Sequence, residues 1–193
     1  MNEVLSENKL FYSVEELRNL GLSYFKINKL VESELLVKLN KKYYENKKYK
    51  GEASDLYYVR PYINNGIISL MTAASYYGLT TIRLHNIDVS IKRKAKVSTM
   101  PVWPVFDIHY FSDERYELGV KEIIVDENMF KIYDIEKTVV DIISFKEKIG
   151  IDETKEVLIN YLSRTDRNIN KIIQYAEVLK CDKVLKSYLE VLL

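Results

Sequence analysis

Few residues of this chain have the types and spacing that catalysis or metal binding requires. The sequence contains one cysteine, Cys181, and two histidines, His85 and His109. A Cys/His metal centre needs several such ligands in a defined spacing, and a disulfide framework needs paired thiols. The glycines are scattered singly, so none of them belongs to a phosphate-binding loop. We therefore expect neither a metal ion nor another cofactor.

Asp107 and His109 are the first candidates for acid–base chemistry. They alternate along a predicted strand, so both side chains would lie on the same face of it. The nearest candidate nucleophiles are ordinary serines, which do not complete a catalytic constellation. We interpret Asp107 and His109 as a solvent-facing pair.

A second group of ionisable residues, Asp134, Glu136, Lys137 and Asp141, gathers near a predicted helix start. Nucleases use carboxylates beside a lysine to hold a metal ion and activate water. The separated acid, acid and lysine of such a site, arranged along a hairpin, are missing here. We interpret Asp134 as the helix cap and the other three as ties to the sheet or to later helices. We therefore expect no catalytic residue in the chain.

The elements that would position a binding surface begin near Ser13. Ser13 followed by Glu16 forms a capping box, which favours a short helix, and Gly21 favours its end. A second helix is predicted over residues 23–34. Two short helices joined by a tight glycine turn are typical of a helix-turn-helix.

Residues 35–44 then alternate and turn like a small hairpin, which is where a winged helix carries its wing. The outer face of the second helix carries side chains suited to a DNA major groove, because lysines reach phosphates or guanine and an asparagine matches adenine. The residues predicted to contact DNA are Tyr24, Lys26, Asn28 and Lys29 on the helix and Lys38, Lys41 and Lys42 on the wing.

Local charge supports this interpretation, although the whole chain has a net charge of only +1. Residues 18–50 hold nine basic residues against three acidic ones, whereas residues 106–141 hold ten acidic against four basic. A basic segment favours contact with phosphates. A charged outer face is also typical of a helix that is merely solvated, and many winged helices bind protein instead of DNA.

The rest of the chain predicts an α+β fold, because strand-like runs precede a series of helices. We expect a small antiparallel sheet. The predicted strands cover residues 86–91, 105–111, 122–125 and 130–133, and the predicted helices cover residues 65–77, 134–145, 152–163, 168–180 and 182–193. A connector over 47–61 divides the chain into residues 1–58, a winged helix-turn-helix DNA-binding domain, and residues 59–193, an α+β domain with C-terminal helices.

Composition places the chain among globular proteins, with 47% hydrophobic and 30% charged residues. No apolar run reaches the roughly 20 residues that a membrane-spanning helix needs. The first ten residues lack the basic-then-apolar layout of a signal peptide. We therefore expect a cytoplasmic protein with no membrane partner.

With both parts interpreted, the chain as a whole resembles the AbiEi family, the antitoxin and transcriptional-regulator half of the AbiE abortive-infection (type IV toxin–antitoxin) systems. Residues 21–31 (GLSYFKINKLV) with their wing carry part of the resemblance. Residues 133–141 (YDIEKTVVD) are similar to the family's Tyr-Asp-x-Glu-Lys-Thr-x-x-Asp run. Similar stretches at 167–170, 175–176 and 188–190 extend the resemblance over nearly the whole chain.

The resemblance implies a two-domain protein that binds inverted repeats in its own promoter, on double-stranded DNA, and represses the operon. It also implies that the second domain is an antitoxin domain, which neutralises a nucleotidyltransferase-like toxin encoded by the neighbouring gene without a stable complex. The same resemblance implies that the seven residues named above, on the predicted helix and wing, contact DNA.

Two other classes of function stay open. The chain would be a plain winged-helix regulator if its second domain senses a ligand or merely dimerises. A third hypothesis is an enzyme, such as a nuclease or a protein kinase acting on the toxin. The identity of the adjacent gene discriminates the first two, because a nucleotidyltransferase-like neighbour favours the antitoxin.

Overall fold

The computed structural model describes residues 4–97 and 99–192 and divides the chain into two compact units. Unit 1 consists of Met1–Asn65, Val97–Pro104 and Glu122–Phe130, and unit 2 consists of Gly66–Lys96, Val105–Lys121 and Lys131–Leu193. The units are therefore not two consecutive stretches of sequence. The predicted boundary at residue 58 falls at the end of a 3-10 helix, η1 (Asp55–Tyr58), inside unit 1.

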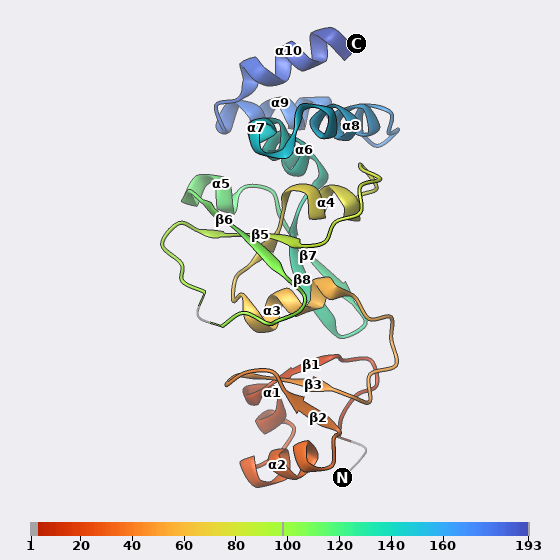
Figure 1. The fold of residues 1–193 in the computed structure, drawn as a ribbon, viewed down its shortest axis with the longest axis vertical. Coiled ribbons are helices and arrows are strands. Elements are labelled where there is room, and N and C mark those ends of the chain that lie inside the picture. Colours follow the sequence, from red (N-terminus) through yellow and green to blue (C-terminus); the bar gives the residue numbers. More distant parts are fainter. Residues whose placement is uncertain (1–3, 98, 193) are drawn as a thin grey trace. The chain divides into compact units, whose positions relative to one another are not determined.

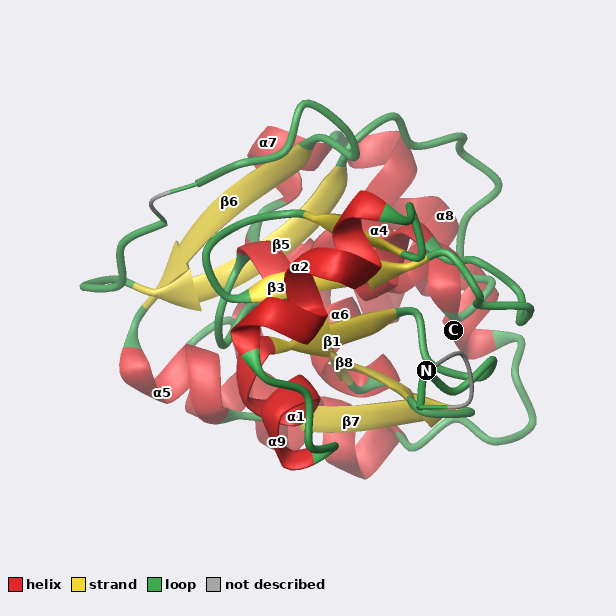
Figure 2. Cartoon of the chain, turned by 90° about the horizontal axis from the view of Figure 1, so that it is seen from below, coloured by secondary structure: helices red, strands yellow, loops and turns green. Residues whose placement is uncertain are grey.

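Unit 1 contains a three-stranded antiparallel sheet with two short helices on one face (Figures 1 and 2). Its elements are β1 (Phe11–Ser13), α1 (Val14–Asn19), α2 (Tyr24–Glu32), β2 (Leu36–Lys38) and β3 (Tyr43–Asn46). The strand order is β1-β3-β2, so the predicted hairpin is present and β1, which was not predicted, pairs with its second strand.

The start and end of α1 follow local sequence signals. The hydroxyl of Ser13 accepts a hydrogen bond from the Glu16 amide at 3.1 Å, and the Glu16 carboxylate accepts one from the Ser13 amide at 2.7 Å. This is the predicted capping box. Gly21, with φ of +78°, adopts the left-handed conformation that ends the helix.

Two buried asparagines hold the remaining segments of unit 1 together. The side-chain amide of Asn46 donates to the carbonyls of Ser6 and Lys9 at 2.8 and 2.7 Å. Asn128 accepts from the Leu10 amide at 2.7 Å and donates to the Asn8 carbonyl at 3.0 Å. These contacts explain why Glu122–Phe130 clusters with a segment that lies more than a hundred residues earlier in the sequence.

The predicted connector is a packed segment of unit 1. After η1, α3 (Val59–Tyr62) continues the chain. The Tyr58 ring contacts Phe11 edge-on at a centroid distance of 4.8 Å and Trp103 at 6.0 Å. Tyr57, which is buried, lies 6.0 Å from the ring of Phe130. Aromatic packing of this kind stabilises the folded state by more than the burial of apolar surface area alone.

Unit 2 is α+β, as predicted. Its elements are β4 (Ile67–Ile68), α4 (Leu70–Tyr76), β5 (Ile87–Lys92), β6 (Phe106–Phe111), α5 (Asp113–Glu117), α6 (Ile135–Ser144), α7 (Lys146–Ile149), α8 (Ile151–Leu162), α9 (Ile169–Val178) and α10 (Asp182–Leu192). The strands β7 (Val120–Val125) and β8 (Asn128–Tyr133), whose residues 122–125 and 128–130 are counted with unit 1, complete a five-stranded sheet in the order β6-β5-β4-β8-β7. The predicted end of the last helix, Leu193, lies outside the described residues.

The predicted antiparallel sheet is wrong for this unit, because the sheet is mixed. β4 pairs with β5 in antiparallel orientation, whereas β5 pairs with β6, and β4 with β8, in parallel. A parallel pair needs a connection of about a dozen residues or more, and residues 93–105 between β5 and β6 have that length. The alternation of apolar and polar residues along a short strand does not show whether the neighbouring strand is parallel or antiparallel to it.

The core of unit 2 is centred on α6, which contacts α4, α8, α9 and α10 (Figure 1). Val139, Val140 and Ile142 are fully buried on this helix. Tyr161 and Ile172 from α8 and α9 complete the contact. None of the helices in the described part of the chain is both long and apolar enough to cross a membrane.

Candidate functional site

The seven side chains predicted to contact DNA all lie on the surface of unit 1. All seven are exposed. Four of them lie on α2: Tyr24, Lys26, Asn28 and Lys29. Lys38 is the last residue of β2, and Lys41 and Lys42 lie in the turn between β2 and β3. The structure therefore leaves each of them accessible to a partner.

The outward face of α2 is determined by what its other face buries. Ile27 and Leu30 are buried in the small core of the unit, where they pack with Leu17 of α1. Ser23 is the N-cap residue of the helix, and its hydroxyl accepts a hydrogen bond from the Lys26 amide at 3.4 Å. Residues between the buried positions must then face solvent, because an α-helix repeats every 3.6 residues.

Asn40 shapes the turn that carries Lys41 and Lys42. Its side-chain oxygen accepts hydrogen bonds from the Lys42 amide at 2.8 Å and the Tyr43 amide at 3.1 Å. Its side-chain amide donates to the Pro61 carbonyl at 3.0 Å, which ties the hairpin turn to α3. An asparagine that bonds its own following backbone is a common way to stabilise a tight turn.

The five lysines of this surface have no acidic partner among the described residues. Within residues 4–97 and 99–192, none of them forms a salt bridge. Other lysines of unit 1 do, since Lys9 lies 2.8 Å from Glu16 and Lys47 lies 2.6 Å from Glu45. The lysines on α2 and the hairpin are therefore available to an external anion such as a phosphate.

Two residues outside the predicted set belong to the same surface. Phe25 is 67% exposed, and the ammonium of Lys29 lies 4.7 Å from its ring centroid. The guanidinium of Arg18, on α1, lies 5.5 Å from the ring of Tyr24. The basic composition of residues 18–50 included Arg18, but only the fold places it beside Tyr24, because the two residues lie on different helices.

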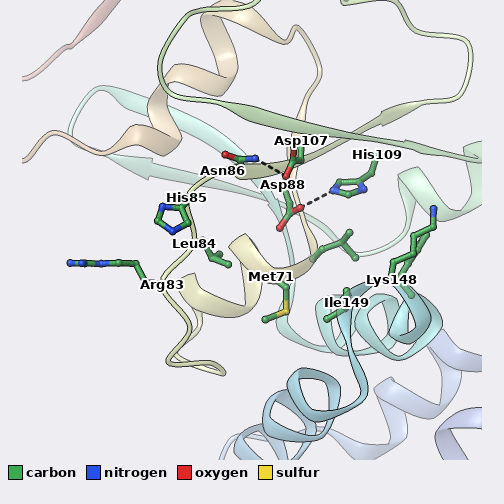
Figure 3. Close-up of a pocket in the computed structure, with 12 residues that line it drawn as sticks. Met71, Arg83, Leu84, His85, Asn86, Asp88, Asp107, His109, Lys148 and Ile149 are labelled. Carbon is green, nitrogen blue, oxygen red and sulfur yellow. Dashed lines mark hydrogen bonds and ion pairs between the residues drawn. The ribbon is translucent and has the colours of Figure 1, made fainter.

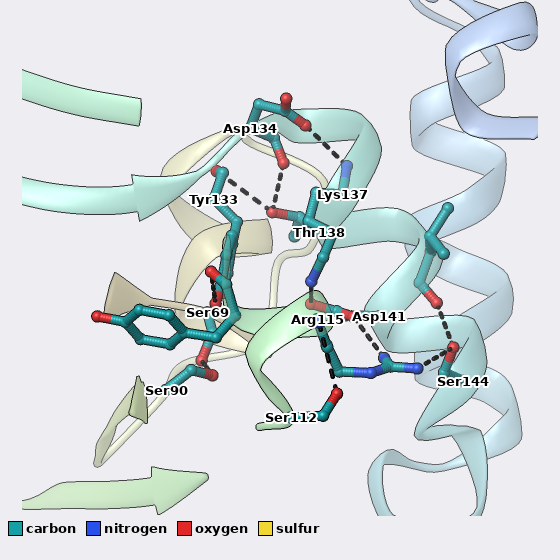
Figure 4. A network of polar contacts seen from close by, with 12 residues as sticks. Ser69, Ser90, Ser112, Arg115, Tyr133, Asp134, Lys137, Thr138, Asp141 and Ser144 are labelled. Carbon is teal, nitrogen blue, oxygen red and sulfur yellow. Dashed lines mark hydrogen bonds and ion pairs between the residues drawn. The ribbon is translucent and has the colours of Figure 1, made fainter. Parts of the chain in front are cut away.

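The second group of ionisable residues forms a buried polar network in unit 2 (Figure 4). Asp134 caps α6, as predicted, by accepting a hydrogen bond from the Lys137 amide at 2.8 Å. Lys171 of α9 binds Glu136 at 2.9 Å and Asp134 at 3.0 Å, and Tyr175 donates to Asp134 at 3.0 Å. The predicted tie between α6 and a later helix is therefore present.

The centre of the network is Asp141, whose side chain is inaccessible to solvent. It forms an ion pair with Lys137, also inaccessible, and a second one with Arg115 of α5 at 2.5 Å. The Lys137 ammonium also lies 4.1 Å from the ring centroid of Tyr133, which fits a cation–π contact. Arg115 was not predicted, because nothing in the local sequence links it to a residue 26 positions later.

Burial and charge act against each other in this network. Burial raises the pKa of Asp141 because desolvation disfavours its charged form, and the cations of Lys137 and Arg115 oppose that shift. Desolvation alone would lower the pKa of Lys171, but its hydrogen bonds to Glu136 and Asp134 raise it. The carboxylates are thus occupied in holding α5, α6 and α9 together.

Gly119 contacts this network directly, which leads to a stability prediction. A Cβ atom at Gly119, where φ is +72°, would lie 2.7 Å from Cβ of Lys137. Gly78 of the same unit has φ of +67° and no atom within 4 Å of such a Cβ. We expect Gly78→Ala to cost about 1–2 kcal/mol through backbone conformation alone, and Gly119→Ala to cost about 1–3 kcal/mol more through overpacking. Urea unfolding of the two variants measures the difference between their free energies of unfolding. Equal losses of stability would show that the Lys137 side chain can move away from the added methyl group without strain.

A pocket of about 440 Å³ lies elsewhere in unit 2, between β5, β6, α4 and α7 (Figure 3). Both histidines of the chain line it. His109 bonds to Asp88 through Nε2 at 2.8 Å, and the Asn86 amide donates to Asp107 at 3.1 Å. Apolar and basic residues complete the lining: Leu70, Met71, Leu84, Phe145, Ile149, Arg83 and Lys148.

The interpretation of Asp107 and His109 as a solvent-facing pair is only partly right. Asp107 is exposed, and both side chains face the same pocket. His109, however, is partly buried and bonds to Asp88 on the neighbouring strand rather than to Asp107. Parallel pairing of β5 and β6 brings these residues together, and the sequence did not predict that pairing.

The described residues contain no cluster of three or more His, Cys, Asp or Glu side chains that could hold a metal ion. A scan against protein-family models found none that matches the chain, and a search of curated proteins found no match.

Proposed function

We propose that this protein is a DNA-binding antitoxin that represses its own operon, with unit 1 acting as a winged helix. The order β1, α1, α2, β2, β3, with a tight glycine turn between the helices, agrees with a helix-turn-helix followed by a wing. One observation carries the DNA-binding half of the proposal: α2 and the hairpin turn expose cationic and amide side chains. The lysines among them lack acidic partners within the described residues.

In this proposal α2 enters the major groove as the recognition helix. Asn28 offers a donor and an acceptor to the edge of an adenine, while Lys26 and Lys29 reach phosphates. Lys41 and Lys42, in the turn of the hairpin, contact the backbone on either side of the groove. Phosphate contacts supply most of the affinity, and base contacts supply the sequence preference.

Asn28→Ala is expected to reduce sequence preference without abolishing binding. The variant should lose about 1–3 kcal/mol of binding free energy on the protein's own promoter and little on random duplex DNA. Lys26→Ala is the matched variant on the same helix, and it should weaken binding to both duplexes equally because phosphates are present in every sequence. Titrations of both duplexes at one fixed salt concentration give the comparison. Equal losses for Asn28→Ala on the two duplexes would remove this residue from base recognition.

The antitoxin half of the proposal is supported by the resemblance of residues 133–141 to the AbiEi family. It predicts a toxic nucleotidyltransferase-like protein encoded by the adjacent gene. The test is growth of cells that express this neighbour, with the full-length antitoxin supplied from an independent promoter. The full chain is used because Val97–Pro104 and Glu122–Phe130 cluster with unit 1, so that a fragment beginning near residue 60 would lack part of a folding unit.

A variant with strongly weakened DNA binding separates neutralisation from repression in this assay. If full-length protein carrying Lys26, Lys29, Lys41 and Lys42 all changed to alanine still restores growth, neutralisation does not depend on DNA binding. If neither wild-type protein nor the variant rescues cells from a toxic neighbour, the antitoxin half fails and the DNA-binding half still stands on its own measurements.

The pocket of unit 2 favours a second candidate, a winged-helix regulator whose second unit senses a small ligand. An adjacent gene encoding an unrelated transporter or enzyme would support this candidate over the antitoxin. A ligand that changes the affinity for promoter DNA would support it as well, since a ligand alters DNA binding only if it binds the two states of the protein differently.

A further inference from the structure

We propose that the pocket between β5, β6, α4 and α7 binds a small organic anion, with an apolar body of about the size of one aromatic ring and one phosphate or carboxylate group. The site is separate from the DNA-contact surface proposed for unit 1, and its argument does not depend on that function. Its volume of about 440 Å³ lies within the range typical of small-molecule sites.

The acidic side chains of the pocket already have partners from their own chain. One oxygen of Asp88 bonds to His109 at 2.8 Å, and the other accepts from the amide and hydroxyl of Thr72 at 3.2 and 3.3 Å. Asp88 thereby also caps the start of α4, whose N-cap residue, Ser69, makes no side-chain hydrogen bond to the helix backbone. Asp107 accepts from Asn86.

Three basic side chains of the pocket have no such partner among the described residues. Arg83, His85 and Lys148 form no salt bridge or hydrogen bond through their side chains within the described parts of the chain, 4–97 and 99–192. Figure 3 shows Arg83 and His85 on one side of the pocket and Lys148 with His109 on the other, with the Arg83 side chain extending away from the other labelled residues. These three side chains are exposed, so in the free protein water solvates them. An anionic ligand that replaces this water would form charge-assisted hydrogen bonds with Arg83 or Lys148, so the charge that the pocket offers to a ligand is positive.

The walls between these donors are apolar. Met71 of α4, Leu84 and Ile149 line the middle of the pocket. Leu70, at the first position of α4, has φ of +44°, a left-handed conformation that is strained for a leucine and is found preferentially at ligand sites. A ligand with an apolar body and an anionic group would use both the apolar and the basic surface of the pocket. Its apolar body would pack against these side chains, and Arg83 or Lys148 would bind its anionic group.

The two histidines provide a direct experimental readout, because both histidines of the chain line this pocket. We would titrate the full-length protein with phenyl phosphate at constant pH and follow the two histidine ring signals by NMR. Both signals are expected to shift and to saturate. The double variant Arg83→Ala/Lys148→Ala, changed at exposed positions, should bind about tenfold more weakly or worse, because charge-assisted hydrogen bonds are lost. Lys155→Ala, an exposed lysine of α8 outside the pocket, should bind like the wild type.

Two simpler probes test the parts of the inference. Phenol has the apolar body without the charge, and inorganic phosphate has the charge without the body, so each should bind more weakly than phenyl phosphate. Binding of phenol as tight as that of phenyl phosphate would overturn recognition of an anion, and equally tight binding of inorganic phosphate would overturn the role of the apolar walls. Absent or unsaturable shifts, or equal affinity in the double variant, would overturn the site itself. None of these outcomes bears on whether unit 1 binds DNA.

Discussion

Replacing Asp141 with alanine is expected to lower the free energy of unfolding by about 3–5 kcal/mol. Asp141 lies between Lys137, which is inaccessible to solvent, and Arg115, whose side chain is 17% exposed. Removing the carboxylate leaves a buried ammonium without a counter-charge, and desolvation of an unpaired charge is costly. A loss of this size is a large fraction of the 5–15 kcal/mol that typically separates folded from unfolded domains.

Urea unfolding followed by circular dichroism measures this loss, with Asp152→Ala as the control. Asp152 is an exposed acid in the first turn of α8, and its removal should cost less than about 1 kcal/mol. The double variant Lys137→Met/Asp141→Leu should recover much of the stability, because well-packed apolar residues often replace a buried ion pair at little cost. If Asp141→Ala unfolds at the same urea concentration as Asp152→Ala, the network does not stabilise unit 2.

The largest effect on DNA binding is expected from changing Lys26, Lys29, Lys41 and Lys42 together to alanine. If each lysine neutralises one phosphate, the slope of log affinity against log salt concentration should become shallower by about three to four units. The loss of affinity should be equal on promoter and random DNA, because phosphate contacts carry no sequence information.

The matched control changes four exposed lysines of unit 2 and therefore removes the same net charge. These residues are Lys155, Lys180, Lys183 and Lys186. If affinity depended only on the net charge of the protein, the two quadruple variants would behave alike. An unchanged salt slope for the first variant would falsify the assignment of α2 and the hairpin turn as the DNA-contact surface.

Local signals were sufficient to predict most helices, among them the two short helices of unit 1, and the hairpin that follows them. The capping box of Ser13 and Glu16, the glycine turn at Gly21 and the hairpin after α2 are all present. Each depends on residues close together in the sequence, so its physical cause is contained in a short segment. The same is true of Asp134 as the cap of α6.

The candidate surface on α2 was predictable for a related reason. A helical period places Lys26 and Asn28 opposite Ile27 and Leu30 as soon as the helix exists. Arg18 and its contact with Tyr24 were missed because two different helices must first pack together. Phe25 was not among the residues predicted to contact DNA, although it is 67% exposed.

The sequence by itself therefore determined the α+β class, most of the helices and the outward residues of α2, because capping, turn formation and helical periodicity act within a few residues. Only the tertiary structure decided the parallel pairing of β5 with β6, the ion pair of Arg115 with Asp141 and the bond of His109 to Asp88. These contacts join residues 19 or more positions apart. They depend on how the chain reverses direction and packs, which no local pattern specifies.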